Sequence, residues 1–122
     1  MPLGTLALDR GALAEAQRLL QDGLEQYIEA GVETALPLAL EQFAALAASQ
    51  GQGVRALRLA GAGAAWRRNL ATYSTPYDAW VKRYISAARL VLSRTEAEEA
   101  WQAGECMSLE QAINYALDDG SA

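Results

Sequence analysis

The chain has 122 residues, 52% of them hydrophobic, and a formal net charge of −5. This length allows one domain with a buried core and is short for two. One cysteine and no histidine exclude an internal disulfide framework and argue against transition-metal sites and histidine-based catalysis. The sequence contains no run of about 20 apolar residues, so it predicts no membrane span. The single cysteine fits a reducing cytoplasm. We therefore expect a cytoplasmic protein, and we expect no membrane contact, no cofactor and no enzymatic activity.

The charges are segregated along the chain. Residues 1–54 hold seven acids and two bases, residues 55–94 hold eight bases and one acid, and residues 95–122 hold seven acids and no base. A basic segment can bind nucleic acid, but overall negative charge repels a phosphate backbone. We therefore expect the basic segment to face the acidic C-terminal segment, within one chain or across a dimer.

Residues 1–31 predict a helical hairpin. A short helix from Leu3 to Leu8 ends before Gly11, and apolar residues then recur at helical spacing from Leu13 to Ile28. Gly31 follows, where a left-handed residue commonly ends a helix.

Residues 34–69 predict a second hairpin that repeats the first. Gly51 stands 40 residues after Gly11, and a fixed period with glycine at the turn is typical of a helical repeat. We expect Thr34 to cap the first helix of this hairpin. The small residues 61–65 follow a helical pattern and not a strand, so they favour close helix packing over a dinucleotide site.

Residues 75–118 predict a C-terminal cap of three helices. Thr95 and Ser108 each begin a capping box. The complete pattern predicts an all-α fold of about seven helices without strands, organised as a single domain over residues 1–122.

Two sets of residues resemble known helical repeats. Leu3-Gly4, Gly11, Ala16 and Leu19-Leu20 resemble a tetratricopeptide repeat. Residues 88–92 (ARLVL), 101–104 (WQAG) and 107–112 (MSLEQA) resemble the C-terminal end of the helical-repeat region in LuxR-type, MalT-like bacterial transcriptional regulators with a STAND-type ATPase core. The resemblance implies tetratricopeptide-like hairpins forming an α-α superhelix, in the C-terminal portion of such a regulator or in a shortened relative. The chain has neither a phosphate-binding loop nor a helix-turn-helix, so ATP hydrolysis and DNA binding are not carried over.

The resemblance also implies a groove along the first helix of each hairpin, where such repeats bind a peptide or a helix. The residues expected to line this groove are Thr5, Leu8, Asp9, Leu38, Glu41, Ala45, Ala48 and Ser49. The N-terminal hairpin has an apolar flank where a preceding repeat would stack, and we expect self-association there.

Arginine and aromatic residues interleave in the basic segment. They predict an exposed surface that includes Arg67, Arg68, Tyr73, Tyr77, Lys82 and Arg83. The function we expect is a non-catalytic protein-interaction module of, or derived from, a bacterial regulator. One alternative is a small-molecule effector domain with a pocket lined by Trp80, Arg89 and Trp101. The other is nucleic-acid binding through residues 55–94.

Overall fold

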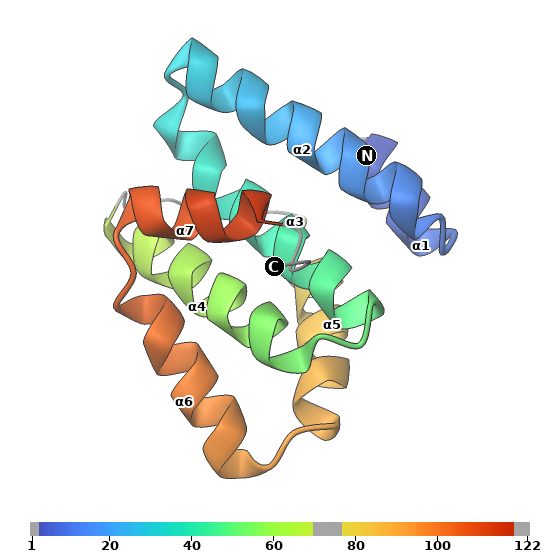
Figure 1. Ribbon diagram of the computed structural model, residues 1–122, viewed down its shortest axis with the longest axis vertical. Helices are drawn as coiled ribbons and strands as arrows, with labels where there is room; N and C mark the ends of the chain where they lie inside the picture. The colour runs from blue at the N-terminus through green and yellow to red at the C-terminus, as the bar shows by residue number, and fades with distance from the viewer. Residues whose placement is uncertain (1–2, 70–76, 119–122) are drawn as a thin grey trace.

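Seven α-helices and one short 3₁₀ helix form the secondary structure of residues 3–69 and 77–118, the part of the chain that the computed structural model describes (Figure 1). The helices are α1 (Leu3–Asp9), α2 (Leu13–Ala30), η1 (Glu33–Ala35), α3 (Leu36–Ser49), α4 (Gly53–Asn69), α5 (Tyr77–Leu90), α6 (Arg94–Glu105) and α7 (Leu109–Leu117). These residues contain no strand. The predicted all-α fold of about seven helices is therefore confirmed.

Left-handed glycines end the first helix of each hairpin. Gly11 has a φ of +79° and Gly51 a φ of +78°, a region that side chains with a Cβ rarely adopt. The backbone bonds match as well, since Ala12 N–H donates to the Ala7 carbonyl and Gln52 N–H donates to the Ala47 carbonyl, both at 2.9 Å. This pattern is the Schellman motif, so the predicted turns at both glycines are confirmed.

Glycines also bring α4 against its neighbours on two sides. A Cβ on Gly61 would overlap the backbone carbonyl of Trp101 in α6, and one on Gly104 would overlap the carbonyl of Arg58 in α4. On the other side of α4, a Cβ on Gly63 would lie 2.9 Å from Cγ of Glu41 in α3. The expectation that the small residues of α4 serve close packing is confirmed.

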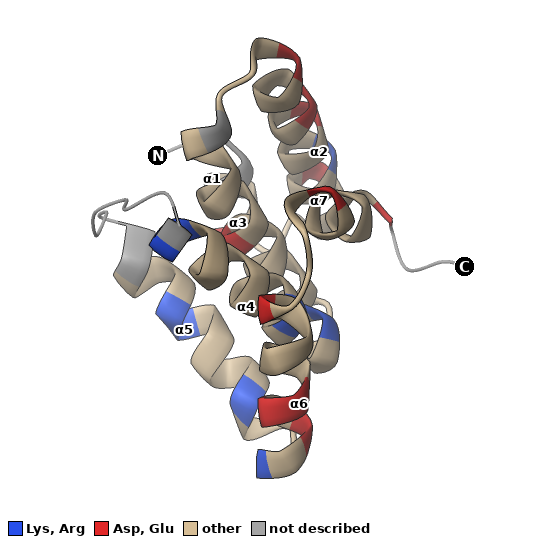
Figure 2. Cartoon of the chain, turned by 90° about the vertical axis from the view of Figure 1, so that its left-hand side faces the viewer, with Lys and Arg blue, Asp and Glu red and all other residues tan. Residues whose placement is uncertain are grey.

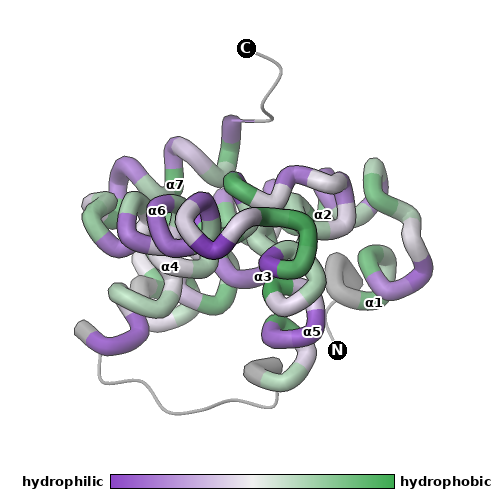
Figure 3. The backbone as a smooth tube through the Cα atoms, turned by 90° about the horizontal axis from the view of Figure 1, so that it is seen from below, coloured by the Kyte–Doolittle hydropathy of each residue, from purple (hydrophilic) through white to green (hydrophobic). Residues whose placement is uncertain are grey.

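The hydrophobic core is centred on the hairpin of α3 and α4. Its largest fully buried side chains are Leu24, Leu40, Leu57 and Leu59. α3 lies in the middle of the molecule, with α1 and α2 on one side and α4 and α6 on the other (Figure 3). Every helix within residues 3–69 and 77–118 is too short or too polar to cross a bilayer.

The last helices do not form a further hairpin. α6 packs along α4, whereas α5 packs on α3 and, to a lesser extent, on α4. In the described part of the chain, α5 and α6 make no extensive contact with each other. The two consecutive helices therefore straddle the α3–α4 hairpin and leave space between them.

Two of the predicted helix starts are wrong and one is confirmed. α6 begins after Ser93, whose hydroxyl accepts from Glu96 N–H at 3.1 Å, because Ser93 with Glu96 makes a capping box two residues before Thr95 does. Thr34 caps no helix, since it lies within η1 and α3 starts after Ala35 without a side-chain cap. Ser108 caps α7 as predicted.

Candidate functional site

A pocket of about 460 Å³ is bounded by α3, α4, α5 and α6. It exists because α5 and α6 pack on the α3–α4 hairpin without closing against each other. A volume of this size lies within the range of sites that hold small organic molecules, about 300–1,000 Å³.

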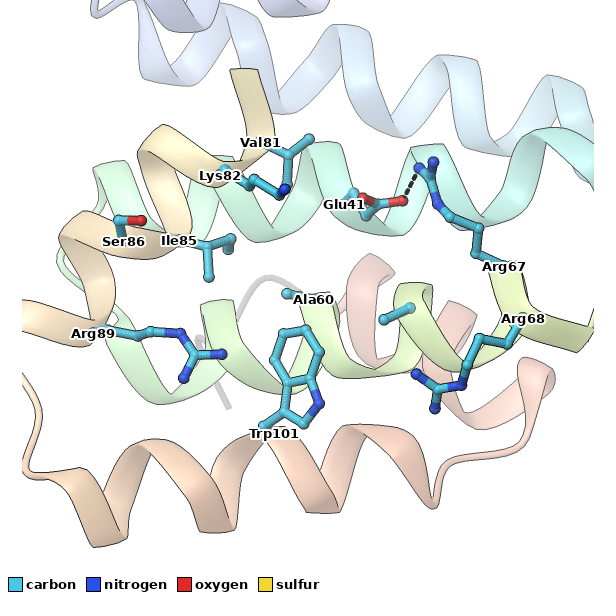
Figure 4. Close-up of a pocket in the computed structure, with 11 residues that line it drawn as sticks. Glu41, Ala60, Arg67, Arg68, Val81, Lys82, Ile85, Ser86, Arg89 and Trp101 are labelled. Atoms are coloured by element: carbon cyan, nitrogen blue, oxygen red, sulfur yellow. Dashed lines mark hydrogen bonds and ion pairs between the residues drawn. The ribbon is translucent and has the colours of Figure 1, made fainter. Parts of the chain in front are cut away.

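The floor of the pocket is apolar. Ala60 and Ala64 come from α4, Val81 and Ile85 from α5, and Trp101 from α6. Figure 4 shows the indole of Trp101 projecting from α6 toward α4, between Arg89 and Arg68. The indole is half-buried, and it lines the pocket together with Ala60 and Ala64 of α4.

Two of the arginines at the pocket are neutralised by carboxylates. Arg67 donates to Glu41, and both side chains are largely buried, with 18% and 13% exposed. Arg68 donates to Glu105 at 2.7 Å, but 62% of its side chain is exposed. An exposed pair of this kind contributes little to stability.

The wall contributed by α5 is polar and positively charged. Lys82, Ser86 and Arg89 follow one another at spacings of four and three residues, which places them on one face of the helix. Among the residues that the structure describes, neither Lys82 nor Arg89 pairs with a carboxylate. The guanidinium of Arg89 instead lies over the Trp101 ring, 5.2 Å from its centroid, in a cation–π contact.

The pocket is therefore amphiphilic. An apolar floor favours the burial of a hydrophobic body, and the α5 wall favours a negative charge beside it. Among residues 3–69 and 77–118, no three His, Cys, Asp or Glu side chains are grouped as a metal site would require.

The predicted groove is not an open surface. Ala45 is fully buried and Leu8 is 3% exposed, so neither can contact a guest. α5 packs across α3, and its side chains Trp80 and Tyr84 both donate to Asp9 at the end of α1. A helix of the chain itself thus covers part of the expected groove.

The other groove residues are dispersed. Glu41 lines the pocket, while Leu38, Ala48 and Ser49 are half-buried. The side chain of Thr5 lies outside the described residues.

Only some residues of the predicted basic and aromatic surface lie close together. Arg67, Arg68 and Lys82 meet at the pocket, whereas Arg83 is exposed and does not line it. Tyr73 and the side chain of Tyr77 lie outside the described residues.

Of the three residues expected to line an effector pocket, Arg89 and Trp101 line the pocket between α5 and α6, and Trp80 does not. Trp80 is 5% exposed, and its Nε1 donates to Asp9 at 2.9 Å, so its ring belongs to the core. Sequence analysis also missed Ser86 as a site residue, although its spacing from Lys82 and Arg89 is visible in the sequence.

Asp9 and Tyr84 form a second polar cluster, away from the pocket. The Tyr84 hydroxyl donates to Asp9 at 2.6 Å, and the Trp80 and Tyr84 rings lie 5.0 Å apart. Burial, together with this hydrogen bond and the negative charge of Asp9, raises the pKa of Tyr84 to about 12. Together, Trp80 and Tyr84 fasten α5 to α1.

The basic segment faces both acidic segments. Arg67 pairs with Glu41 of the N-terminal segment, and Arg68 pairs with Glu105 of the C-terminal one. Figure 2 shows basic residues along α5 and acidic residues on α2 and α6. The basic segment was expected to meet the acidic C-terminal segment, and Arg68 does so through Glu105. The contact of Arg67 with Glu41 in the N-terminal segment was not expected.

Comparison of the chain with family models, with curated proteins and with solved structures found no match. The function is therefore argued from the pocket and its side chains.

Proposed function

We propose that this chain is a non-catalytic binding module whose site is the pocket between α5 and α6, and that its guest is a small molecule. The observation that supports this most directly is the position of Trp101. Its indole lies over the alanine floor of the pocket, beside two cations of α5. In the described part of the chain, these two cations have no carboxylate partner. Aromatic and arginine side chains in a concave site commonly dominate binding energy.

The geometry favours a small guest over an extended peptide. A peptide groove would need Leu8 and Ala45 at the surface, and both are buried. The pocket, by contrast, is bounded by four helices and has a volume suited to a small molecule.

The resemblance to LuxR-type, MalT-like regulators suggests the setting of this binding. In such a protein, a helical module of this kind would sense an effector and report it to the rest of the regulator. We propose this role on the resemblance alone.

Tryptophan fluorescence and thermal unfolding of the purified chain test the binding function. Across a panel of small metabolites, at least one class is expected to give a saturable change in emission and a higher melting temperature, because a ligand that binds only the folded state stabilises it. The variant Trp101→Leu should lose the stabilisation, whereas Trp66→Phe, which alters a tryptophan outside the pocket, should retain it. A flat response from the whole panel, with helical circular dichroism intact, would contradict the proposal.

A second candidate function is the protein interaction expected from the sequence. An apolar groove of about 510 Å³ lies between α2 and α7, lined by Ile28, Leu109, Ile113 and Leu117 among others. Ile28 is 42% exposed, and Tyr27 and Val32, which lie near it in the sequence, are each 40% exposed. These side chains support self-association or a partner at the N-terminal hairpin.

In sedimentation velocity, Ile28→Glu should then lower the fraction of dimer. A chain that stays monomeric at every concentration would argue against self-association.

Nucleic-acid binding through residues 55–94 gains no support from the geometry. Arg55 donates to backbone carbonyls of α7, and Arg67 donates to Glu41. Both guanidiniums are thereby engaged inside the molecule and do not join one continuous basic surface.

A further inference from the structure

We infer that the guest of the pocket is a small aromatic anion, with a flat apolar body on Trp101 and a carboxylate or phosphate held by Lys82 and Arg89. This inference rests on the proposed function and adds the chemical class of the ligand. It follows from the distribution of charge around the pocket, from the shape of its floor and from its size.

The balance of charge at the pocket points to an anion. Five charged side chains line it, four of them cationic, and Glu41 is the one carboxylate among the lining residues. Glu41 lies against Arg67, and Glu105 lies against Arg68. Two positive charges then remain, those of Lys82 and Arg89, for which the described residues supply no carboxylate. A guest with one or two negative charges would neutralise them.

The α5 wall offers several hydrogen-bond donors to an anionic group. Lys82 and Arg89 are two helical turns apart on one face of α5, with the hydroxyl of Ser86 between them. An ammonium, a hydroxyl and a guanidinium can all donate hydrogen bonds to carboxylate or phosphate oxygens. The cations that α4 contributes, Arg67 and Arg68, already donate to Glu41 and Glu105, so the charge of the guest belongs at the α5 wall.

The rest of the pocket favours a flat apolar body. Ala60 and Ala64 present only methyl groups, and Trp101 contributes its indole ring. Arg89 already lies 5.2 Å from the centroid of that indole, so a guest anion near Arg89 would also place its body beside the ring. Offset stacking on an indole is favourable for aromatic rings.

The test compares two probes that share a body and differ in charge, 2-naphthoate and 2-naphthamide. Isothermal titration calorimetry on the full chain at low ionic strength should give about tenfold tighter binding for the naphthoate, the scale of one charge-assisted hydrogen bond. Acetate, which has the charge and no body, should show no measurable binding. The advantage of the naphthoate should shrink as salt is added, because salt screens these charges.

Substitutions on α5 test which residues cause the tighter binding of 2-naphthoate. The double variant Lys82→Gln/Arg89→Gln should bring the two probes to equal affinity, because the charge of the naphthoate then has no cation at the α5 wall. The matched control is Arg83→Gln, which removes an exposed positive charge of α5 that does not line the pocket. This control should keep the full advantage.

Two failures can be told apart. Equal affinity for both probes, with both lost in Trp101→Leu, would overturn the inferred anion and leave the proposed binding site in place. Absence of binding by either probe to the folded chain would overturn the inference and count against the proposed function as well.

Discussion

Asp9 connects the first helix to the fifth through two hydrogen bonds. It accepts from Trp80 Nε1 at 2.9 Å and from the Tyr84 hydroxyl at 2.6 Å. The carboxylate thereby determines which face of α5 turns toward α1. Since Lys82, Ser86 and Arg89 lie on a different face of α5, the same contact directs them to the pocket.

The hydroxyl of Tyr84 makes stability sensitive to alkaline pH. The pKa of Tyr84 is about 12 in the folded chain, above the ordinary tyrosine value of 10.0 that applies when the chain is unfolded. The unfolded chain thus loses this proton first, and the stabilisation is complete below pH 10 and declines between pH 10 and 12. Chemical denaturation across this interval should show a fall in the free energy of unfolding that is smaller in Tyr84→Phe. An equal fall in both chains would assign the alkaline loss to other groups.

Gly61 and Gly104 set the distance between α4 and α6. Each faces a backbone carbonyl of the other helix, and no Cβ fits at either position. Because Trp101 lies on α6, this distance also determines how far the indole reaches over the alanines of α4. A glycine contact thus helps to shape the pocket.

Gly104→Ala should therefore lower the free energy of unfolding by about 1–3 kcal/mol, the usual cost of overpacking. The control is Gly23→Ala, in the middle of α2, where an added Cβ meets nothing within 4 Å. There, alanine should stabilise the chain by up to about 1 kcal/mol through helix propensity. Urea denaturation monitored by circular dichroism measures both. Stabilisation by Gly104→Ala would show that α4 and α6 are not in close contact.

At the scale of the helices, one arginine links α7 to α4. The guanidinium of Arg55 donates to the carbonyls of Tyr115 at 2.8 Å and Ala116 at 3.2 Å, and also to that of Asp118. It lies 4.7 Å from the centroid of the Tyr115 ring. The last carbonyls of a helix lack partners within the helix, so Arg55 satisfies them and fastens α7 to α4.

Arg55→Met keeps the aliphatic stem and removes these donors. We expect it to lower the free energy of unfolding by about 1–3 kcal/mol. Hydrogen exchange should accelerate in residues 109–117 before it does so in α3. The control Arg18→Met, at an exposed position of α2, should change neither quantity. Unchanged exchange in α7 of the Arg55 variant would show that apolar contacts alone hold this helix.

At the scale of the whole molecule, the site results from an interruption of the hairpin pattern. The first four helices pair as hairpins, whereas α5 and α6 separate and pack on different parts of the α3–α4 hairpin. The pocket lies in the gap between them and takes its charge from α5 and its indole from α6. A third hairpin would have closed this space.

Local features of the fold are predictable from the sequence, and the site is predictable only in part. Gly11 and Gly51 mark their turns because the left-handed conformation is a property of the residue itself. Lys82, Ser86 and Arg89 share a face for a similarly local reason. The sequence around Trp80, however, does not show that this side chain contacts Asp9, which is 71 residues away in the sequence. For the same reason, the covering of the expected groove by α5 was not foreseen.

The indole N–H signals of the three tryptophans test the central claim most directly. In ¹H–¹⁵N spectra, with each signal assigned by a Trp→Phe variant, 2-naphthoate should shift the Trp101 signal to saturation. The Trp80 signal, whose N–H is held by Asp9, should stay in place. A Trp101 signal that does not move, or three signals that move alike without saturation, would contradict a binding site between α5 and α6.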